Sequence, residues 1–206
     1  RLWKKLGSLE VVVFFVEVLI FGMAMGVIER GLLFIFVLKD LGGSTTLCGA
    51  IVGVTVLFEL PIFHYSGVIL DRIGHSNALL ASFLSYVGRV WGYTLLTPET
   101  KHYILALEMV HGVTFALMWV AVVEKSRQLT PKGWGTTFQS LLGGTYSMLG
   151  QGLGAALGGL VMEKYGSVML FRGCSILVAA MFLARAVTSV VIKCCRKKPS
   201  ASINDN

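Results

Sequence analysis

Residues 9–38 read LEVVVFFVEVLIFGMAMGVIERGLLFIFVL, an almost unbroken apolar run that decides the fold class. A helix needs about 20 predominantly apolar residues to cross the hydrocarbon core of a bilayer. The run exceeds that length, and its only ionisable residues are Glu10, Glu17, Glu29 and Arg30. It therefore predicts a membrane-spanning helix.

The same pattern recurs along the chain and predicts an all-α membrane protein. Hydrophobic residues make up 55% of the 206 residues and charged residues only 14%, which is more apolar surface than one soluble core can hide. We expect six transmembrane helices in one unit over residues 1–192, followed by a basic, disordered cytoplasmic tail over 193–206. The six predicted spans are Leu9 to Leu38, Thr46 to Leu70, Asn77 to Leu96, Tyr103 to Val123, Thr136 to Met162 and Val168 to Ile192.

The net charge of +7 reports topology, because the basic residues gather in alternate loops. If both termini are cytoplasmic, eleven lysines and arginines lie inside and only Lys39, Lys101 and Lys164 lie outside. Positively charged residues are enriched on the cytoplasmic side of membrane proteins. The pattern predicts a multi-pass protein with both ends of this segment in the cytoplasm, and nothing in it indicates nucleic-acid binding.

The four cysteines form no CxxC pair and no spaced metal pattern, so no metal site and no cofactor are predicted. Cys194 and Cys195 stand beside a basic cluster at the end of the last span, where they are either palmitoylation sites or unmodified thiols. The sequence has no initiator methionine and no cleavable signal peptide. We expect it to be a fragment of a longer protein.

Glycines repeat every fourth residue in several predicted spans, which places a smooth stripe on one helix face. The repeats are Gly22 with Gly26, Gly49 with Gly53, and Gly150 with Gly154 and Gly158. Such a stripe serves close helix packing, and in a transporter also the sliding of helices.

In the second span, Pro61 removes a backbone hydrogen bond and predicts a kink two residues after Glu59.

Ionisable residues in the spans are the candidate functional groups, because each costs about 2.5–3.5 kcal/mol to insert at a helix centre. Glu59, Arg89 and His111 come from three different spans and fall at similar depth in the bilayer. Arg89 stays protonated and needs a counter-charge, for which Glu59 and Glu108 are the nearest by depth. Second-rank candidates are Glu17, Glu29, Arg30 and Thr114, and Glu29 and Arg30 are not expected to pair with each other.

In the fourth span, helical spacing places Glu108, His111, Phe115 and Trp119 on one face. A carboxylate, an imidazole and two aromatic rings could bind a polar solute. The same carboxylate and imidazole could also carry a proton. Alternatively, the two polar groups hydrogen-bond a neighbouring helix, or Glu108 is wetted from the outer surface.

Four segments resemble a known family: DRIGHSNALLASFLSYVGRVWG (71–92), HGVTFALMWVA (111–121), QSLLGGTYSMLGQGLGAALGG (139–159) and EKYGSVMLFR (163–172). They are similar to the lactose-permease-like group of the major facilitator superfamily, which includes major facilitator superfamily domain-containing protein 6. The resemblance covers most of residues 17–188. It implies helices 7 to 12 of a twelve-helix transporter, whose partners are a homologous amino-terminal half, the lipid bilayer, a small polar solute and a proton.

The resemblance also assigns roles to residues. Arg89 matches the helix-nine arginine of the permease's proton-coupling network, His111 matches its helix-ten histidine, and Glu59 lies about one turn from its helix-eight acid. The permease has a glutamate three residues after the histidine, where this sequence has Thr114, so Glu108 is a hypothetical replacement from the other side. Asp71, Arg72 and Gly74 resemble the cytoplasmic loop motif that influences the inward and outward states.

Two functions follow as alternatives. The first is half of a secondary transporter, proton-coupled and carrying a small polar solute such as a sugar or nucleoside. The second is a membrane receptor or scaffold that keeps the fold and has lost transport. No nucleophile elbow, metal cluster or phosphate-binding loop indicates an enzyme. The embedded polar residues favour transport, since a scaffold has little reason to tolerate their insertion cost.

Overall fold

The computed structural model describes residues 9–196, and the side chains of residues 9–186 apart from Ser76. The described residues form helices joined by short connections and contain no strand, which confirms the all-α prediction. In chain order, the elements are α2 (Leu9–Glu29), α3 (Leu32–Ile35), η1 (Phe36–Asp40), α4 (Thr45–Ile73), α5 (His75–Tyr93), η2 (Lys101–Tyr103), α6 (Ile104–Met109), η3 (Val113–Leu117), α7 (Met118–Leu129), α8 (Gly135–Gly143), η4 (Gly144–Gly150), α9 (Gln151–Tyr165) and α10 (Ser167–Arg196).

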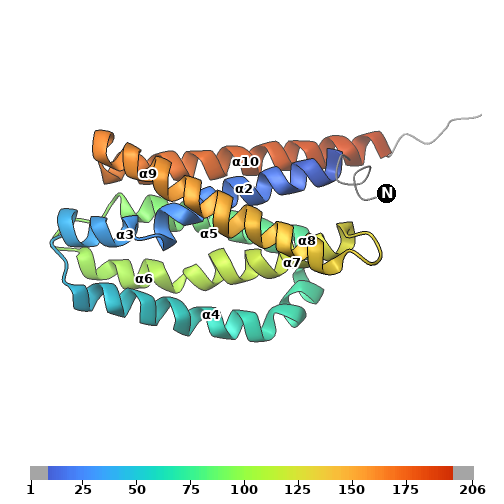
Figure 1. Cartoon of the computed structure of the whole chain (residues 1–206). Coiled ribbons are helices and arrows are strands. Elements are labelled where there is room, and N and C mark those ends of the chain that lie inside the picture. Colours follow the sequence, from blue (N-terminus) through green and yellow to red (C-terminus); the bar gives the residue numbers. More distant parts are fainter. Residues whose placement is uncertain (1–8, 197–206) are drawn as a thin grey trace, which may run out of the picture.

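The long helices lie side by side as a bundle (Figure 1). α2 packs against η4 and α9, α5 packs against α10 and η3, and α4 forms one edge of the bundle against α6 and η3. Buried apolar side chains from all these layers make one continuous core. The fourth and fifth segments of the chain, residues 101–129 and 135–165, are each a single rod in which a π-helical stretch lies between α-helices.

Four helical segments are long and apolar enough to cross a membrane: Leu9–Asp40, Thr45–Ile73, Lys101–Leu129 and Ser167–Ala186. They confirm a multi-pass membrane protein. The other two predicted spans correspond to α5 and to α8 with α9. These helices are long, but inward-facing polar residues such as Ser82 and Arg89, and the glycines of α9, make them less apolar. Six spans therefore stay a prediction.

Glycines allow α2 to approach η4 and α9 closely, as the stripes at Gly22/Gly26 and Gly150/Gly154 predict. A Cβ atom on Gly154 would lie 2.0 Å from the Met23 carbonyl oxygen, and one on Gly26 would lie 2.4 Å from the Gln151 carbonyl oxygen. Real Cβ atoms do not approach backbone that closely, so a side chain here would force the helices apart. By contrast, a Cβ on Gly49 or Gly53 would meet no other described atom.

Two breaks between helices differ from the prediction, one in its presence and the other in its length. The first span is interrupted at Arg30 and Gly31, and Gly31 has φ 99°, a conformation that side chains other than glycine rarely adopt. The predicted loop over residues 71–76 is wrong: α4 continues to Ile73, α5 begins at His75, and only Gly74, with φ 77°, separates them. Both breaks are short because a glycine in each has a positive φ.

α4 is the least buried of the four candidate spans. Only 11% of its most apolar window is buried, against 56% for the first span. The helix runs through Pro61 without ending there. Large apolar side chains such as Leu57 and Leu60 point outward from it. α4 thus presents a wide apolar face to whatever surrounds the bundle.

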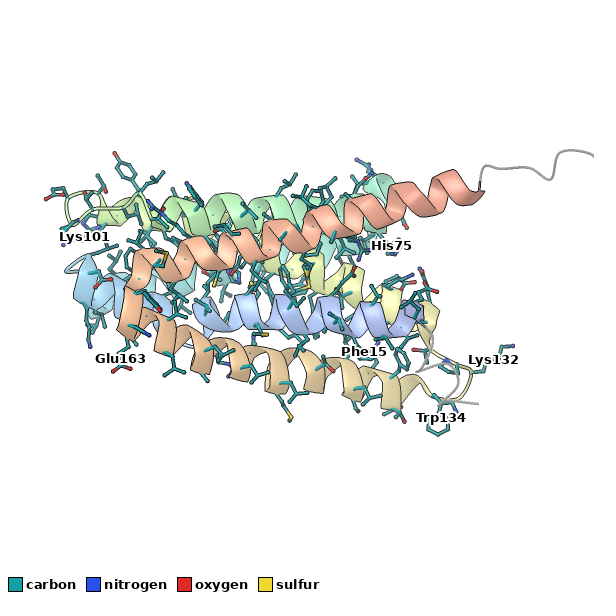
Figure 2. The ribbon with its side chains drawn as sticks, turned by 90° about the horizontal axis from the view of Figure 1, so that it is seen from above. Phe15, His75, Lys101, Lys132, Trp134 and Glu163 are labelled. Carbon is teal, nitrogen blue, oxygen red and sulfur yellow. The ribbon has the colours of Figure 1, made fainter. Side chains whose placement is uncertain are left out.

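The two ends of the bundle carry different loops. Figure 2 places Lys101 and Glu163 at one end, and His75, Lys132 and Trp134 at the opposite end. This separation agrees with the alternation in which Lys101 and Lys132 were assigned to opposite sides of the membrane.

The last helix, α10, continues to Arg196, past the predicted start of the tail at 193. Cys194 and Cys195 lie outside the residues whose side chains the structure describes.

Candidate functional site

Five ionisable side chains from four helical segments converge inside the bundle, and we call them the polar cluster. They are Glu29 of α2, Glu59 of α4, Arg89 of α5, Glu108 of α6, and His111 between α6 and η3. Arg89, Glu108 and His111 are buried, with 2%, 1% and 4% of their surfaces exposed. Charged groups are almost never buried to this degree unless they are paired.

Arg89 finds its counter-charge in Glu108. Arg89 Nη1 lies 3.4 Å from Glu108 Oε2, whereas Glu59, the other carboxylate considered from the sequence, forms no ion pair with it. Glu108 also accepts a hydrogen bond from the Tyr93 hydroxyl and one from Thr55 Oγ1 at 3.1 Å. Three donors from two neighbouring helices therefore hold one carboxylate, which satisfies most of its acceptor capacity.

The contacts of His111 define its protonation state. Arg89 Nη1 hydrogen-bonds to Nδ1 of the imidazole. A guanidinium has donors only, so Nδ1 must be the acceptor and the ring proton must be on Nε2. Nε2 lies 3.0 Å from Glu59 Oε1 and 3.9 Å from Glu29 Oε1. In this arrangement His111 is a neutral imidazole that accepts from Arg89 and donates to Glu59.

Glu29 reaches the polar cluster through the break in the first span. Gln151, at the junction of η4 and α9, donates from Nε2 to Glu29 and accepts at Oε1 from Arg30 Nη2 at 2.6 Å. Glu29 and Arg30 do not pair directly, as predicted, but the same amide connects them. The bridge joins two irregular points of the backbone, Gly31 and the end of the π-helical η4.

A cavity of about 350 Å³ opens beside the polar cluster. Its polar wall is formed by Glu29, Thr55, Glu59, Glu108 and His111. Its apolar wall contains the rings of Phe34 and Phe115 together with aliphatic side chains of α2, α3 and α4. A concave, mostly apolar site with a few convergent polar groups is the usual form of a small-molecule binding site.

Trp119 contacts a residue of the cavity wall but is not itself part of that wall. The Phe115 ring stacks on Trp119 at 6.2 Å and lies 5.9 Å from the His111 ring, while Trp119 contacts Tyr146 at 5.0 Å. Trp119 therefore supports the ring that lines the cavity and does not line it itself. Thr114 is buried and donates its hydroxyl to the Val110 carbonyl. No ion pair or side-chain hydrogen bond connects Thr114 to the polar cluster within the described residues.

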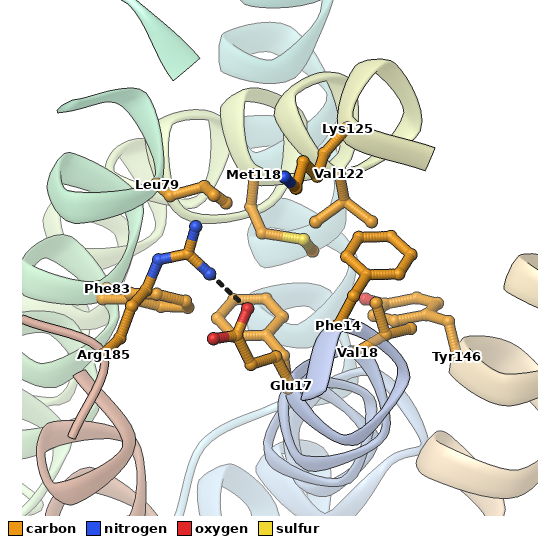
Figure 3. Close-up of a pocket in the computed structure, with 11 residues that line it drawn as sticks. Phe14, Glu17, Val18, Leu79, Phe83, Met118, Val122, Lys125, Tyr146 and Arg185 are labelled. Carbon is orange, nitrogen blue, oxygen red and sulfur yellow. Dashed lines mark hydrogen bonds and ion pairs between the residues drawn. The ribbon is translucent and has the colours of Figure 1, made fainter. Parts of the chain in front are cut away.

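Glu17 lies about 18 Å from Glu29 along α2, at 1.5 Å per residue. Its carboxylate forms an ion pair with Arg185 of α10. The pair lies beside a cavity of only about 20 Å³, and Lys125 and Tyr146 are among the residues around it (Figure 3). That volume is enough for one water molecule and excludes a solute.

Asp71 and Arg72 are exposed in the last turn of α4, next to the break at Gly74. They lie at the end of α4 remote from the cavity, since Glu59 is at its midpoint. Arg172 places its guanidinium over the Trp91 ring at 5.7 Å, away from the polar cluster. Of the residues predicted for the site, the structure brings together Glu29, Glu59, Arg89, Glu108 and His111. It places Glu17, Asp71 and Arg72 away from them.

Three residues of the site went unpredicted: Thr55, Tyr93 and Gln151. None of them is ionised at neutral pH, so the insertion cost that identified the other candidates is small for them. A signal existed for two of them. Thr55 precedes Glu59 by one helical turn, and Tyr93 follows Arg89 by one turn, so each shares a helix face with an ionisable candidate.

No solved structure matches this chain. A match exists at the level of the sequence family, and it extends from residue 1 to residue 173 of the 206. It includes every member of the polar cluster and every residue that lines the cavity. The matching family is the MFS_1 like family, and the chain therefore belongs to this family of the major facilitator superfamily, a superfamily of transporters.

Proposed function

We propose that this chain is the carboxy-terminal half of a secondary active transporter that moves a small polar solute, such as a sugar or nucleoside, in a proton-coupled cycle of alternating access. The observation that carries the proposal is the cavity beside the polar cluster. Glu59, which lines it, stands at the midpoint of α4, a candidate membrane span. Transporters of this architecture bind solute and coupling ion near the bilayer midplane.

The contacts of Glu59 support proton coupling. Its carboxylate receives a hydrogen bond from neutral His111 and forms no ion pair with a lysine or arginine of the described chain. A carboxylate that no fixed cation neutralises and that borders a cavity and an imidazole is placed to receive a proton and to pass it on. Glu108, by contrast, is held as the counter-ion of Arg89. Glu59 is thus the proposed proton acceptor, with His111 as its neighbour in the relay.

The exposed face of α4 supports the partner half. α4 buries little within this chain, and its side of the bundle contains the cavity. A homologous amino-terminal half packed there would cover the cavity and complete a twelve-helix transporter. Asp71 and Arg72, at the cytoplasmic end of α4 in the proposed orientation, would then contact the moving interface as a gating loop.

The test is uptake of labelled sugars and nucleosides into proteoliposomes that contain the full-length protein. We expect uptake that depends on an imposed proton gradient and is lost in Arg89→Ala, because that change leaves Glu108 and His111 without their shared donor. Arg172→Ala, which removes a guanidinium outside the polar cluster, is the matched control and should transport normally. No uptake of any solute by well-folded protein would favour the receptor or scaffold function.

A further inference from the structure

The cavity beside the polar cluster presents negative charge and no positive charge. Glu29, Glu59 and Glu108 line it, and no lysine or arginine does so among the described residues. Arg89 stands behind this wall and is paired with Glu108. His111 also lines the cavity, but it is neutral while it accepts from Arg89. A ligand in the cavity therefore faces an excess of negative charge, because Arg89 pairs with Glu108 and leaves Glu29 and Glu59.

The two remaining carboxylates differ in how they are compensated. Glu29 is hydrogen-bonded by Gln151, whose other end is bound to Arg30, so a cation stands two contacts away. Among the described residues, Glu59 receives a hydrogen bond from the Nε2–H of His111 alone. Its side chain is 17% exposed, toward the cavity that it lines. Glu59 is thus the group that a cation entering the cavity would reach with the least competition.

The apolar wall suits the rest of such a ligand. Phe34 and Phe115 contribute aromatic rings to the lining that holds the carboxylates. A cation over an aromatic ring gains about 0.5–2 kcal/mol, more when water is excluded. A volume of about 350 Å³ is at the lower end of small-molecule sites, so it fits a compact organic ion.

We infer that the solute of this transporter is a monovalent organic cation with an apolar body, such as a quaternary ammonium or a protonated amine, and that it exchanges for the proton on Glu59. The inference rests on the proposed transport function and changes its solute: an organic cation stands in place of the sugar or nucleoside. One proton leaves Glu59 as one cation binds the carboxylate, so the exchange carries no net charge. Proton and solute then move in opposite directions across the membrane.

The direction of the driving gradient separates this exchange from sugar or nucleoside symport. The probes are labelled tetraethylammonium and 1-methyl-4-phenylpyridinium, whose permanent charges do not vary with pH, beside labelled glucose and uridine. We expect vesicles with an acidic lumen to take up the two cations at least tenfold faster than vesicles without a gradient. Raising the external proton concentration should inhibit cation uptake by competition at Glu59.

Variants locate the effect. Glu59→Gln removes the carboxylate and keeps the hydrogen bond from His111, so cation uptake and binding should fall at least tenfold, whereas Glu59→Asp should retain part of both. Glu163→Gln removes a carboxylate at the end of the bundle, outside the cavity, and should behave as the wild type (Figure 2). Thermal unfolding in detergent checks that each variant folds.

The outcomes distinguish the two proposals. Glucose or uridine uptake driven by an acidic exterior, without binding of either cation, would overturn the cationic substrate and leave the transporter intact. Cation uptake that Glu59→Gln does not change would overturn the exchange at Glu59. If folded protein takes up none of the four probes under either gradient, the inference fails together with the transport function for these solutes.

Discussion

At the scale of single residues, the site depends on one nitrogen of Arg89, Nη1, which contacts both Glu108 and His111. His111 connects Arg89 to Glu59. Arg89 donates to Nδ1, so the ring proton is on Nε2, and Nε2 faces Glu59. A lysine at position 89 would bring the same charge, but its ammonium has neither the reach nor the planar shape that places Nη1 between Glu108 and His111. The arginine thus controls the acid on α4 without touching it.

The Tyr93 hydroxyl should contribute measurably to stability. Tyr93→Phe removes a buried hydrogen bond to the Glu108 carboxylate, so we expect the free energy of unfolding to fall by about 1.5–3 kcal/mol. Denaturant unfolding in detergent micelles measures this change. Tyr103→Phe is the control, because Tyr103 is 68% exposed, and its loss of a hydroxyl should have little effect. Equal effects of the two changes would contradict the role given to Tyr93.

The Arg89–Glu108 pair should behave as a coupled unit. Glu108→Leu alone leaves a guanidinium buried without its carboxylate, and breaking a buried pair costs about 3–5 kcal/mol. Adding Arg89→Met should recover part of that loss, because neither charge is then left unpaired. A double-mutant cycle on the same unfolding measurement gives the coupling. Additive effects would mean that the two groups do not interact.

The sequence could predict the ionisable members of the site and could not predict how they are connected. Glu59, Arg89 and His111 were identified by depth, which follows from counting residues along each span. Whether Arg89 pairs with Glu59 or Glu108 depends on the rotation of each helix about its axis, which counting does not give. Gln151 was not predicted because it lies among glycines, which indicate close packing of helices.

At the scale of elements, the close contact between α2 and α9 is the most constrained feature of the bundle. Gly154→Ala places a Cβ against the Met23 carbonyl, so we expect a loss of stability of about 1–3 kcal/mol, measured by thermal unfolding in detergent. Gly152→Ala is matched to it in helix and residue type, yet its Cβ would meet no other described atom. It should be neutral or stabilising by up to about 1 kcal/mol. Equal destabilisation by both changes would contradict the role given to the close contact, because alanine favours the helix at both positions and only position 154 meets another helix.

Helix boundaries could be predicted where the sequence changes from apolar to polar. They were wrong where a glycine interrupts the helix. Asp71 and Arg72 look like loop residues by charge, but polar side chains at a helix end can reach the interface, and α4 continues through them. At the other break, the apolar run hid the interruption at Gly31. The charged pair Glu29 and Arg30 directly before that glycine was the signal available in the sequence.

At the scale of the whole molecule, the bundle and its charges predict an orientation. A single cysteine at position 101 should react with a membrane-impermeant maleimide in intact cells, and one at position 132 only after permeabilisation, because these positions lie at opposite ends of the bundle (Figure 2). The side assigned to each follows from the excess of basic residues near Lys132. The reverse labelling pattern would invert the proposed topology, and with it the side to which Asp71 and Arg72 belong.

The pairing of acids and bases across helices has a consequence for biosynthesis. The ribosome makes α4 and α5 before α6, so Glu59 and Arg89 enter the membrane before Glu108 and His111 exist. During that interval each carries its insertion cost without a partner. A nascent chain stopped before Ile104 would hold Arg89 without the Glu108 carboxylate and Glu59 without the His111 imidazole. Synthesis of the fourth segment supplies both partners, whereas Glu29 and Glu17 receive theirs, Gln151 and Arg185, only with the last two segments.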